Sequence, residues 1–180
     1  MDIPISFKIY LQWKNLFNKK EDNHQIKISK EGRGVRSILF FLPEKIQDAK
    51  IVNYLVKVEN PLPGYDIGLV CSERSKMFYP HIDNVKLFTF NDEDLNYFDT
   101  IKSVLFMDKI RLKNYDAIVD LNTEFCAATT MLAFELDAPL KIGFDSIVNR
   151  KIFTITLERK ENTFLESYFS RILNLLGVKL

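Results

Sequence analysis

Four positions near the ends of predicted strands carry residue types that suit ligand binding. Asp120 and Asn122 close an apolar segment that begins at Tyr115, and a carboxylate and an amide can both hydrogen-bond a bound ligand. Either side chain could instead cap the helix that follows. Lys141 offers an ammonium group, either to a phosphate or as a solvated charge at the edge of the sheet. Gly143 permits a close approach of a ligand to the backbone, or a tight exit from its strand.

Apolar runs alternate with segments of helical spacing from residue 37 onward, and these segments are the elements that must position the polar residues. The predicted strands are 37–42, 65–70, 84–88, 115–121, 140–143 and 152–156. The predicted helices are 44–59, 72–78, 101–112, 123–136 and 164–176, with Ser72 capping the second and Gly177 the last. Alternating strands and helices imply a Rossmann-like three-layer α/β/α domain with a mostly parallel sheet.

Ligands in domains of this kind bind beyond the carboxyl ends of the strands. We therefore expect a site among the loops after Leu42 and Val70, the turn from Asp120 to Thr123, and Gly143 to Asp145. The acidic run 91–94 lacks the glycine and the terminal glutamate of a calcium-binding loop. It is predicted to be a solvated loop and helix start.

The composition excludes several classes of protein. Twenty-five basic and 24 acidic residues leave a net charge of +1, which argues against a nucleic-acid-binding domain. Cys71 and Cys126 lie among apolar residues and are predicted to be buried free thiols, and His24 and His81 lack the spacing of a zinc site. We expect no metal and no cofactor. The sequence shows neither an apolar run of ~20 residues nor a signal peptide, so we predict a cytoplasmic protein.

Residues 1–35 are predicted to be an amphipathic appendage and linker, separate from a single domain at 36–180. Large apolar residues recur at helical spacing in this segment, and lysines surround them. The segment could pack on its own domain, or it could bind another protein or a second copy of the chain. It could also lie on a membrane surface, which would make the protein peripheral to the inner membrane. The residues for that contact are Tyr10, Trp13, Leu16 and Phe17.

Four segments, taken in order, resemble glycosyltransferase family 9, the heptosyltransferases of lipopolysaccharide core assembly. They are SILFF at 37–41 followed by Gln47-Asp48, YDAIVDLN at 115–122, APLKIGFD at 138–145, and FLESYF at 164–169 leading to LLG at 175–177. The resemblance extends over about 145 residues, from residue 36 to the end of the chain. It implies the fold of the N-terminal half of a GT-B glycosyltransferase.

The resemblance also implies a role for Asp48, which would activate the acceptor hydroxyl as a general base. The plainer alternative is an exposed aspartate favoured by the dipole at the start of a helix. The family's first loop is rich in glycine, whereas Pro43–Gln47 contains none.

Two hypotheses about function follow from the resemblance, because the family's nucleotide-sugar contacts lie in a second domain that we expect to be missing here. The first is a heptosyltransferase-like acceptor-side domain standing alone, which binds or scaffolds without complete transferase activity. It would associate with itself or with a separate donor-domain protein. The second is the acceptor-binding half of a split glycosyltransferase. That enzyme would move a sugar from a nucleotide donor to a lipopolysaccharide or lipid-linked acceptor.

Overall fold

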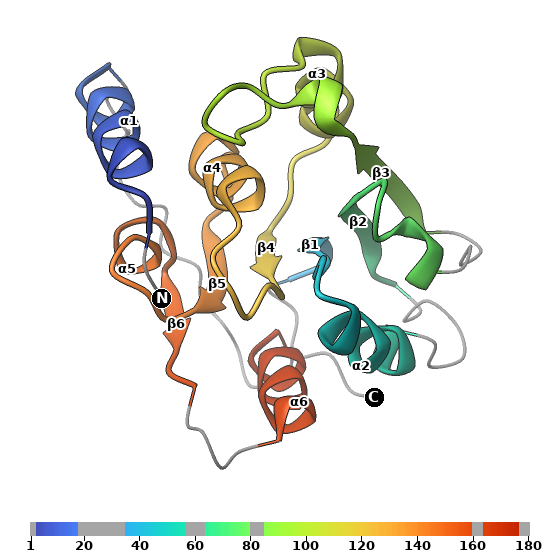
Figure 1. The fold of residues 1–180 in the computed structure, drawn as a ribbon. Helices are drawn as coiled ribbons and strands as arrows, with labels where there is room; N and C mark the ends of the chain where they lie inside the picture. The colour runs from blue at the N-terminus through green and yellow to red at the C-terminus, as the bar shows by residue number, and fades with distance from the viewer. Residues whose placement is uncertain (1–2, 18–34, 57–63, 80–84, 160–163, 177–180) are drawn as a thin grey trace.

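The computed structural model describes residues 3–17, 35–56, 64–79, 85–159 and 164–176. Its strands form one sheet in which all neighbours run parallel, in the order β3-β2-β1-β4-β5-β6 (Figure 1). The strands are β1 (Ser37–Phe41), β2 (Asp66–Ser72), β3 (Lys86–Phe90), β4 (Ala117–Asp120), β5 (Leu140–Phe144) and β6 (Ile155–Leu157). This is the strand order of the Rossmann fold, and the direction of winding reverses between β1 and β4.

The two central strands are apolar because helices cover both faces of the sheet. In β1, Ile38 and Leu39 are fully buried although their side chains point to opposite faces. In β4 every residue is buried, including Asp120 at its carboxyl end. The register pairs Ile38 with Ala117 and Phe41 with Asp120, so the carboxyl ends of β1 and β4 lie together.

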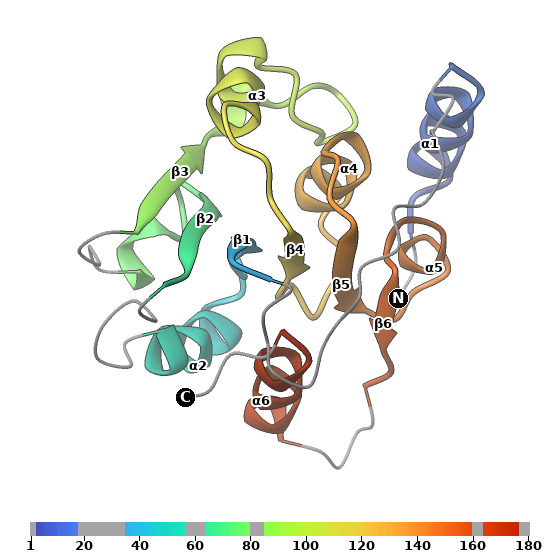
Figure 2. The same ribbon diagram turned by 180° about the vertical axis from the view of Figure 1, so that it is seen from behind.

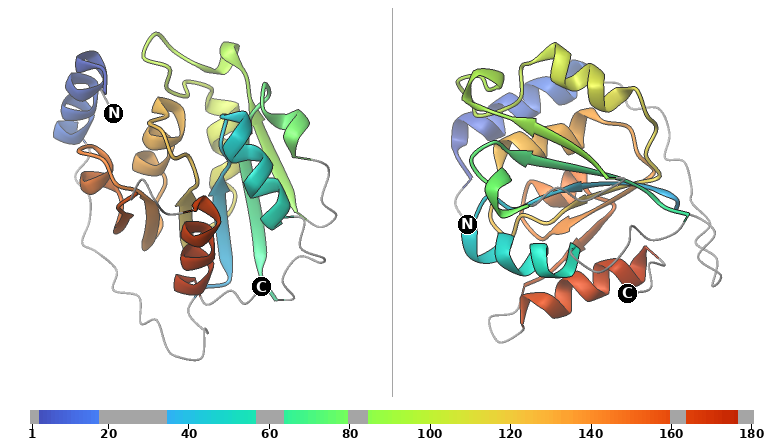
Figure 3. Two further views of the ribbon diagram at one scale, coloured as in Figure 1. Left: turned by 60° about the horizontal axis from the view of Figure 1, so that its bottom comes forward. Right: turned by 90° about the vertical axis from the view of Figure 1, so that its right-hand side faces the viewer.

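Helices form a layer on each side of the sheet, as Figures 2 and 3 show. On one side, α2 (Ile46–Val56) and α6 (Leu165–Leu175) contact each other and enclose one apolar core. The other side holds α1 (Ile5–Phe17), α3 (Val104–Arg111), α4 (Ala127–Glu135) and α5 (Asn149–Ile152), which enclose a second core. The predicted Rossmann-like three-layer class is confirmed, and the sheet is parallel throughout its described strands.

The N-terminal helix packs on its own domain. Ile3, Phe7 and Leu11 are at most 6% exposed and belong to the second core. The ammonium group of Lys14 bonds the carboxylate of Glu135 at the end of α4. The structure of α1 therefore agrees with the first of the three interpretations, in which this segment packs on its own domain. Residues 18–34, which carry the predicted linker, are outside the described part of the chain.

Several helices begin at later residues than predicted. Ser72 continues β2 and pairs with Phe90, so the prediction that it caps a helix is wrong, and only a 3₁₀ turn follows at Lys76–Phe78. Helix α3 starts after Ser103, whose hydroxyl accepts from the Phe106 amide at 3.3 Å. The predicted cap at Gly177 lies outside the described residues.

The acidic run 91–94 and the two thiols follow the sequence-based predictions, with one exception. The run is a 3₁₀ turn at Asp92–Asp94, closed by a capping box between Asn91 and Asp94. Cys71 and Cys126 are both free thiols, but only Cys71 is fully buried.

Candidate functional site

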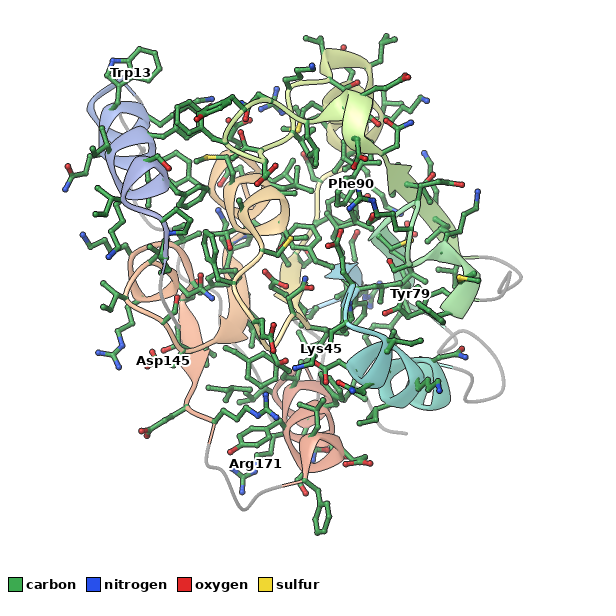
Figure 4. All side chains as sticks on the ribbon, in the orientation of Figure 1. Trp13, Lys45, Tyr79, Phe90, Asp145 and Arg171 are labelled. Carbon is green, nitrogen blue, oxygen red and sulfur yellow. The ribbon has the colours of Figure 1, made fainter. Side chains whose placement is uncertain are left out.

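The structure brings Asp48 and Thr123 together where the sheet changes its direction of winding. Asp48 lies in the first turn of α2 after β1, and its carboxylate accepts a hydrogen bond from the Thr123 hydroxyl on the loop after β4. The same two loops are joined by an ion pair between Lys45 Nζ and Glu124 Oε1 at 2.5 Å, and Figure 4 shows Lys45 near the start of α2. The plainer interpretation of Asp48 is right about its place in the first turn of a helix and wrong about its exposure, because the residue is only 6% exposed. Its assignment as a general base stays a prediction.

Asp120, Asn122 and Thr129 form a buried hydrogen-bonded cluster beside that point. Asp120 Oδ1 accepts from the Asn122 amide at 3.0 Å and from Asn122 Nδ2 at 2.7 Å, and Oδ2 accepts from the Thr129 hydroxyl at 3.0 Å. Burial raises the pKa of Asp120 to about 6, although these hydrogen bonds oppose the shift. Neither Asp120 nor Asn122 caps α4, because the N-cap is Cys126 and it makes no side-chain cap bond. The capping interpretation is therefore wrong.

Lys141 and Gly143 serve the packing around β5. Lys141 is 5% exposed, and its ammonium group donates to the carbonyls of Ala133 and Leu136 at 2.7 Å each. It stabilises the C-terminal end of α4, where a cation is favoured, so the solvated-charge interpretation is wrong. A Cβ atom added to Gly143 would lie 3.1 Å from two ring atoms of Phe153. The absent side chain thus makes room for an aromatic ring, and a role for either residue in ligand binding stays a prediction.

A cavity of about 600 Å³ opens at the carboxyl edge of the sheet, within the size range of small-molecule sites. It lies between the ends of β2 and β3, the loop after β4, the first turn of α4 and the N-terminal segment. Its lining residues are Pro4, Ser6, Phe7, Glu44, Ser72, Arg74, Phe90–Asp92, Leu95–Asp99 and Phe125–Ala128. Asp48, Asp120, Asn122, Lys141 and Gly143 do not line it. The cavity thus lies at the edge of the sheet where a site is predicted, but the predicted residues do not form its wall, and ligand binding there stays a prediction.

The loop from Leu95 to Ile101 is a compact wall of the cavity, and the side chain of Asn96 organises it. Asn96 Oδ1 accepts from the amides of Phe98 at 2.9 Å and Thr100 at 3.2 Å, while Nδ2 donates to Thr100 Oγ1 at 2.8 Å. An antiparallel bridge between Leu95 and Ile101 closes the base of the loop. These contacts leave little freedom to the residues between them.

Aromatic contacts connect this loop and α4 to the N-terminal helix. The rings of Tyr10 and Phe98 stack at 4.9 Å between centroids, and those of Phe7 and Phe125 meet edge to face at 4.8 Å. Phe7 and Phe125 also line the cavity. Helix α1 therefore completes the site. The sequence holds little sign that α1 lines the cavity. An aromatic residue on the buried face of a predicted helix, such as Phe7, is the only signal, and it fits a core position equally well.

The outer face of α1 carries three exposed apolar residues. Ile5, Ile9 and Trp13 are 74, 61 and 56% exposed, and Trp13 points away from the domain in Figure 4. Tyr10, one of the residues named for a possible membrane contact, stacks inward on Phe98. The side chains of Leu16 and Phe17 are outside the described part. Within the described segments, no helix combines the length and apolar character needed to cross a bilayer.

The charged side chains around the cavity are mainly acidic. Glu44, Asp92 and Asp99 line it with one cation, Arg74, whose guanidinium bonds the Asp92 carboxylate. The three carboxylates and one guanidinium give a net side-chain charge of −2. Among the described residues, no three His, Cys, Asp or Glu side chains gather in a way that could hold a metal ion.

Comparison with solved structures places this fold beside glycosyltransferases. The heptosyltransferase WaaC of E. coli, solved with ADP, superimposes with a TM-score of 0.56 at 14% identity, over 79% of this chain and 48% of that one. A family 9 glycosyltransferase of Veillonella parvula superimposes with a TM-score of 0.58 at 17% identity, over 80% of this chain and 42% of that one. The sequence matches no protein-family model and no curated protein.

These likenesses establish the fold class that the sequence motifs indicated. The chain has a Rossmann-like α/β fold of the kind found in family 9 heptosyltransferases. It spans less than half the length of the two solved enzymes.

Proposed function

We propose that the chain is a glycosyltransferase-like acceptor-side domain that binds a sugar-containing ligand in the cavity and does not complete sugar transfer alone. The cavity is the observation that carries this proposal. It lies where Rossmann-like domains bind ligands, and about 600 Å³ accommodates a small saccharide. Its wall combines aromatic rings with carboxylate, amide and hydroxyl groups, which suits a ligand with both C–H faces and hydroxyl groups.

The setting of Asp48 favours binding over catalysis in this chain. A general base must reach the proton that it removes, within hydrogen-bond distance or through one water. The Asp48 carboxylate is buried, bonded to Thr123, and not part of the cavity wall. Its contact joins the loops after β1 and β4, which is a structural task. The two solved transferases superimpose on this chain over less than half of their own lengths, so their complete transfer activity is not carried over to it.

The binding proposal is tested by filling the cavity. Ala127 lines it from the first turn of α4, so Ala127→Phe should abolish retention on a glycan array without changing the folded circular-dichroism spectrum. Ser167→Phe, on the exposed face of α6 in the opposite layer, is the matched control and should bind as the parent does. Equal glycan retention by the parent and Ala127→Phe would refute the assignment of this cavity as the binding site.

The alternative is the acceptor half of a split enzyme that glycosylates a lipopolysaccharide or lipid-linked acceptor. It is favoured by the match to only 48% and 42% of the two transferases, which leaves room for a donor domain on a second chain. Under this alternative, a companion protein co-purifies from the native host, and the pair transfers sugar from a nucleotide donor. Asp48→Asn would then abolish transfer while leaving glycan binding intact. Persistent transfer by the Asp48→Asn pair would exclude Asp48 as the base.

A further inference from the structure

We propose that the cavity selects an uncharged sugar ring, which stacks on Tyr97, and discriminates against phosphorylated sugars. This inference rests on the proposed function and adds the ligand class. Tyr97 is 93% exposed and yet lines the cavity from the Leu95–Ile101 loop. A tyrosine ring offers a large apolar face with a polar tip, so a sugar ring can cover the face while its hydroxyl groups meet the phenol oxygen.

The loop holds this ring in place before any ligand arrives. The Asn96 side chain makes three hydrogen bonds within the loop, and the Phe98 ring, next to Tyr97, stacks on Tyr10 of α1. Tyr97 and Phe98 meet edge to face, with 5.5 Å between ring centroids. A recognition loop that is already ordered avoids part of the entropy cost of binding.

One residue of the loop is held in an uncommon backbone conformation. Asp99 has a φ of 55°, in the left-handed region that non-glycine residues seldom adopt. Such positions persist where surrounding contacts enforce them, and they concentrate at ligand sites. Asp99 lines the same cavity as Tyr97.

Charge decides which sugars this loop can accept. The four charged side chains of the wall sum to −2, and the single guanidinium is already engaged by Asp92. The first turn of α4 contributes the opposite sign, but a helix N-terminus is equivalent to only about half a positive charge. The carboxylates therefore outweigh the helix end. A phosphate group would meet net repulsion, while a hydroxyl group could donate to the carboxylates.

The test uses an array that presents each sugar in two forms, the uncharged glycan and its phosphate ester, and compares how much protein each form retains. We expect the parent protein to retain uncharged members at least tenfold better than their phosphates. Tyr97→Ala should lower retention of the uncharged members at least tenfold, and Tyr97→Phe should keep it because the ring remains. Met77→Ala removes another exposed apolar side chain, 80% exposed and outside the cavity wall, and should change nothing.

Glu44→Gln combined with Asp99→Asn tests the role of the wall's negative charge. Asparagine tolerates the left-handed backbone conformation at residue 99, so the fold is kept while two negative charges are removed. Because removing one exposed like charge changes an affinity by up to about fivefold, removing two should improve retention of phosphorylated members by up to roughly 25-fold. Uncharged members should change by less than about threefold.

The outcomes separate this inference from the proposed function. Equal or better retention of phosphorylated glycans by the parent, still lost in Ala127→Phe, overturns the ligand class and leaves the cavity as a saccharide site. Unchanged retention in Tyr97→Ala overturns the stacking role. Retention of neither class overturns the proposed function itself.

Discussion

Asp120 should make the protein less stable as the pH rises from 4 to 7. The carboxyl group is 3% exposed, and burial raises its pKa from an ordinary 3.8 to about 6 in the folded state. Between these two values the folded protein binds more protons than the unfolded chain, so the free energy of unfolding falls with rising pH. The loss begins near pH 4 and is complete slightly above pH 6.

The expected size of the effect follows from the pKa difference. A difference of about two pKa units corresponds to about 3 kcal/mol at pH 7, because one unit is worth ~1.4 kcal/mol. Asp120→Asn removes this term. The amide oxygen can keep the hydrogen bonds from Asn122, and the amide nitrogen can donate to the Thr129 hydroxyl. A small part of the effect is already present at pH 4, so the variant should gain stability over the parent by about 2–2.5 kcal/mol between pH 4 and pH 7.

Urea unfolding of both proteins at pH 4, 5, 6 and 7 measures this difference. Other carboxylates titrate alike in the two proteins and cancel when the parent's unfolding free energy is subtracted from the variant's. A constant offset at all four pH values would mean only that the amide packs better or worse than the acid. A difference that does not grow with pH would refute the raised pKa and its origin in burial.

Three further outcomes follow from the packing. Gly143→Ala should lower the free energy of unfolding by about 1–3 kcal/mol, because its Cβ would lie 3.1 Å from the Phe153 ring. In a double-mutant cycle, adding Phe153→Leu should recover part of that loss, whereas additive losses would exclude the clash. Leu11→Ala should lower the free energy of unfolding in urea by about 2–5 kcal/mol, since this side chain is 4% exposed, whereas a detached α1 would give no change. Burial raises the pKa of both Cys71 and Cys126 to about 11, so their reaction with a disulfide reagent at pH 8 should be about 100-fold slower than in 6 M guanidinium; equal rates would show that the thiols are not protected.

Much of the sheet could be predicted because its strands are defined by local composition. The runs at 37–42 and 115–121 are apolar on both faces, and a strand enclosed by two helical layers requires that pattern. The four-residue helix α5 was not predicted, because so short an element has no detectable period. Ser72 misled the prediction, since serine at a strand end and serine at a helix cap look alike in sequence.

The site was less predictable because its wall is assembled from distant segments. The edge of the sheet followed from topology. Lys141 was interpreted as a phosphate contact or a solvated charge, but it lies buried under the end of α4 and bonds two backbone carbonyls there. Asp48 and Thr123 are 75 residues apart, and no local sequence pattern indicates that the Thr123 hydroxyl donates a hydrogen bond to the Asp48 carboxylate. Likewise, the ordered Leu95–Ile101 loop depends on how Asn96 turns its amide, and composition does not encode that detail.

The position of α1 sets an order of events during synthesis. Its inward face rests on Phe98, Phe125 and Glu135, and the Lys14–Glu135 pair spans 121 residues. At translation speeds of ~5–20 residues per second, the ribosome needs about 6–24 s to make that stretch. Through that interval Phe7 and Leu11 have no α4 to cover them, so these apolar side chains stay exposed on the nascent chain. Docking of α1 therefore has to wait for α4, and until then the cavity lacks the wall that α1 contributes.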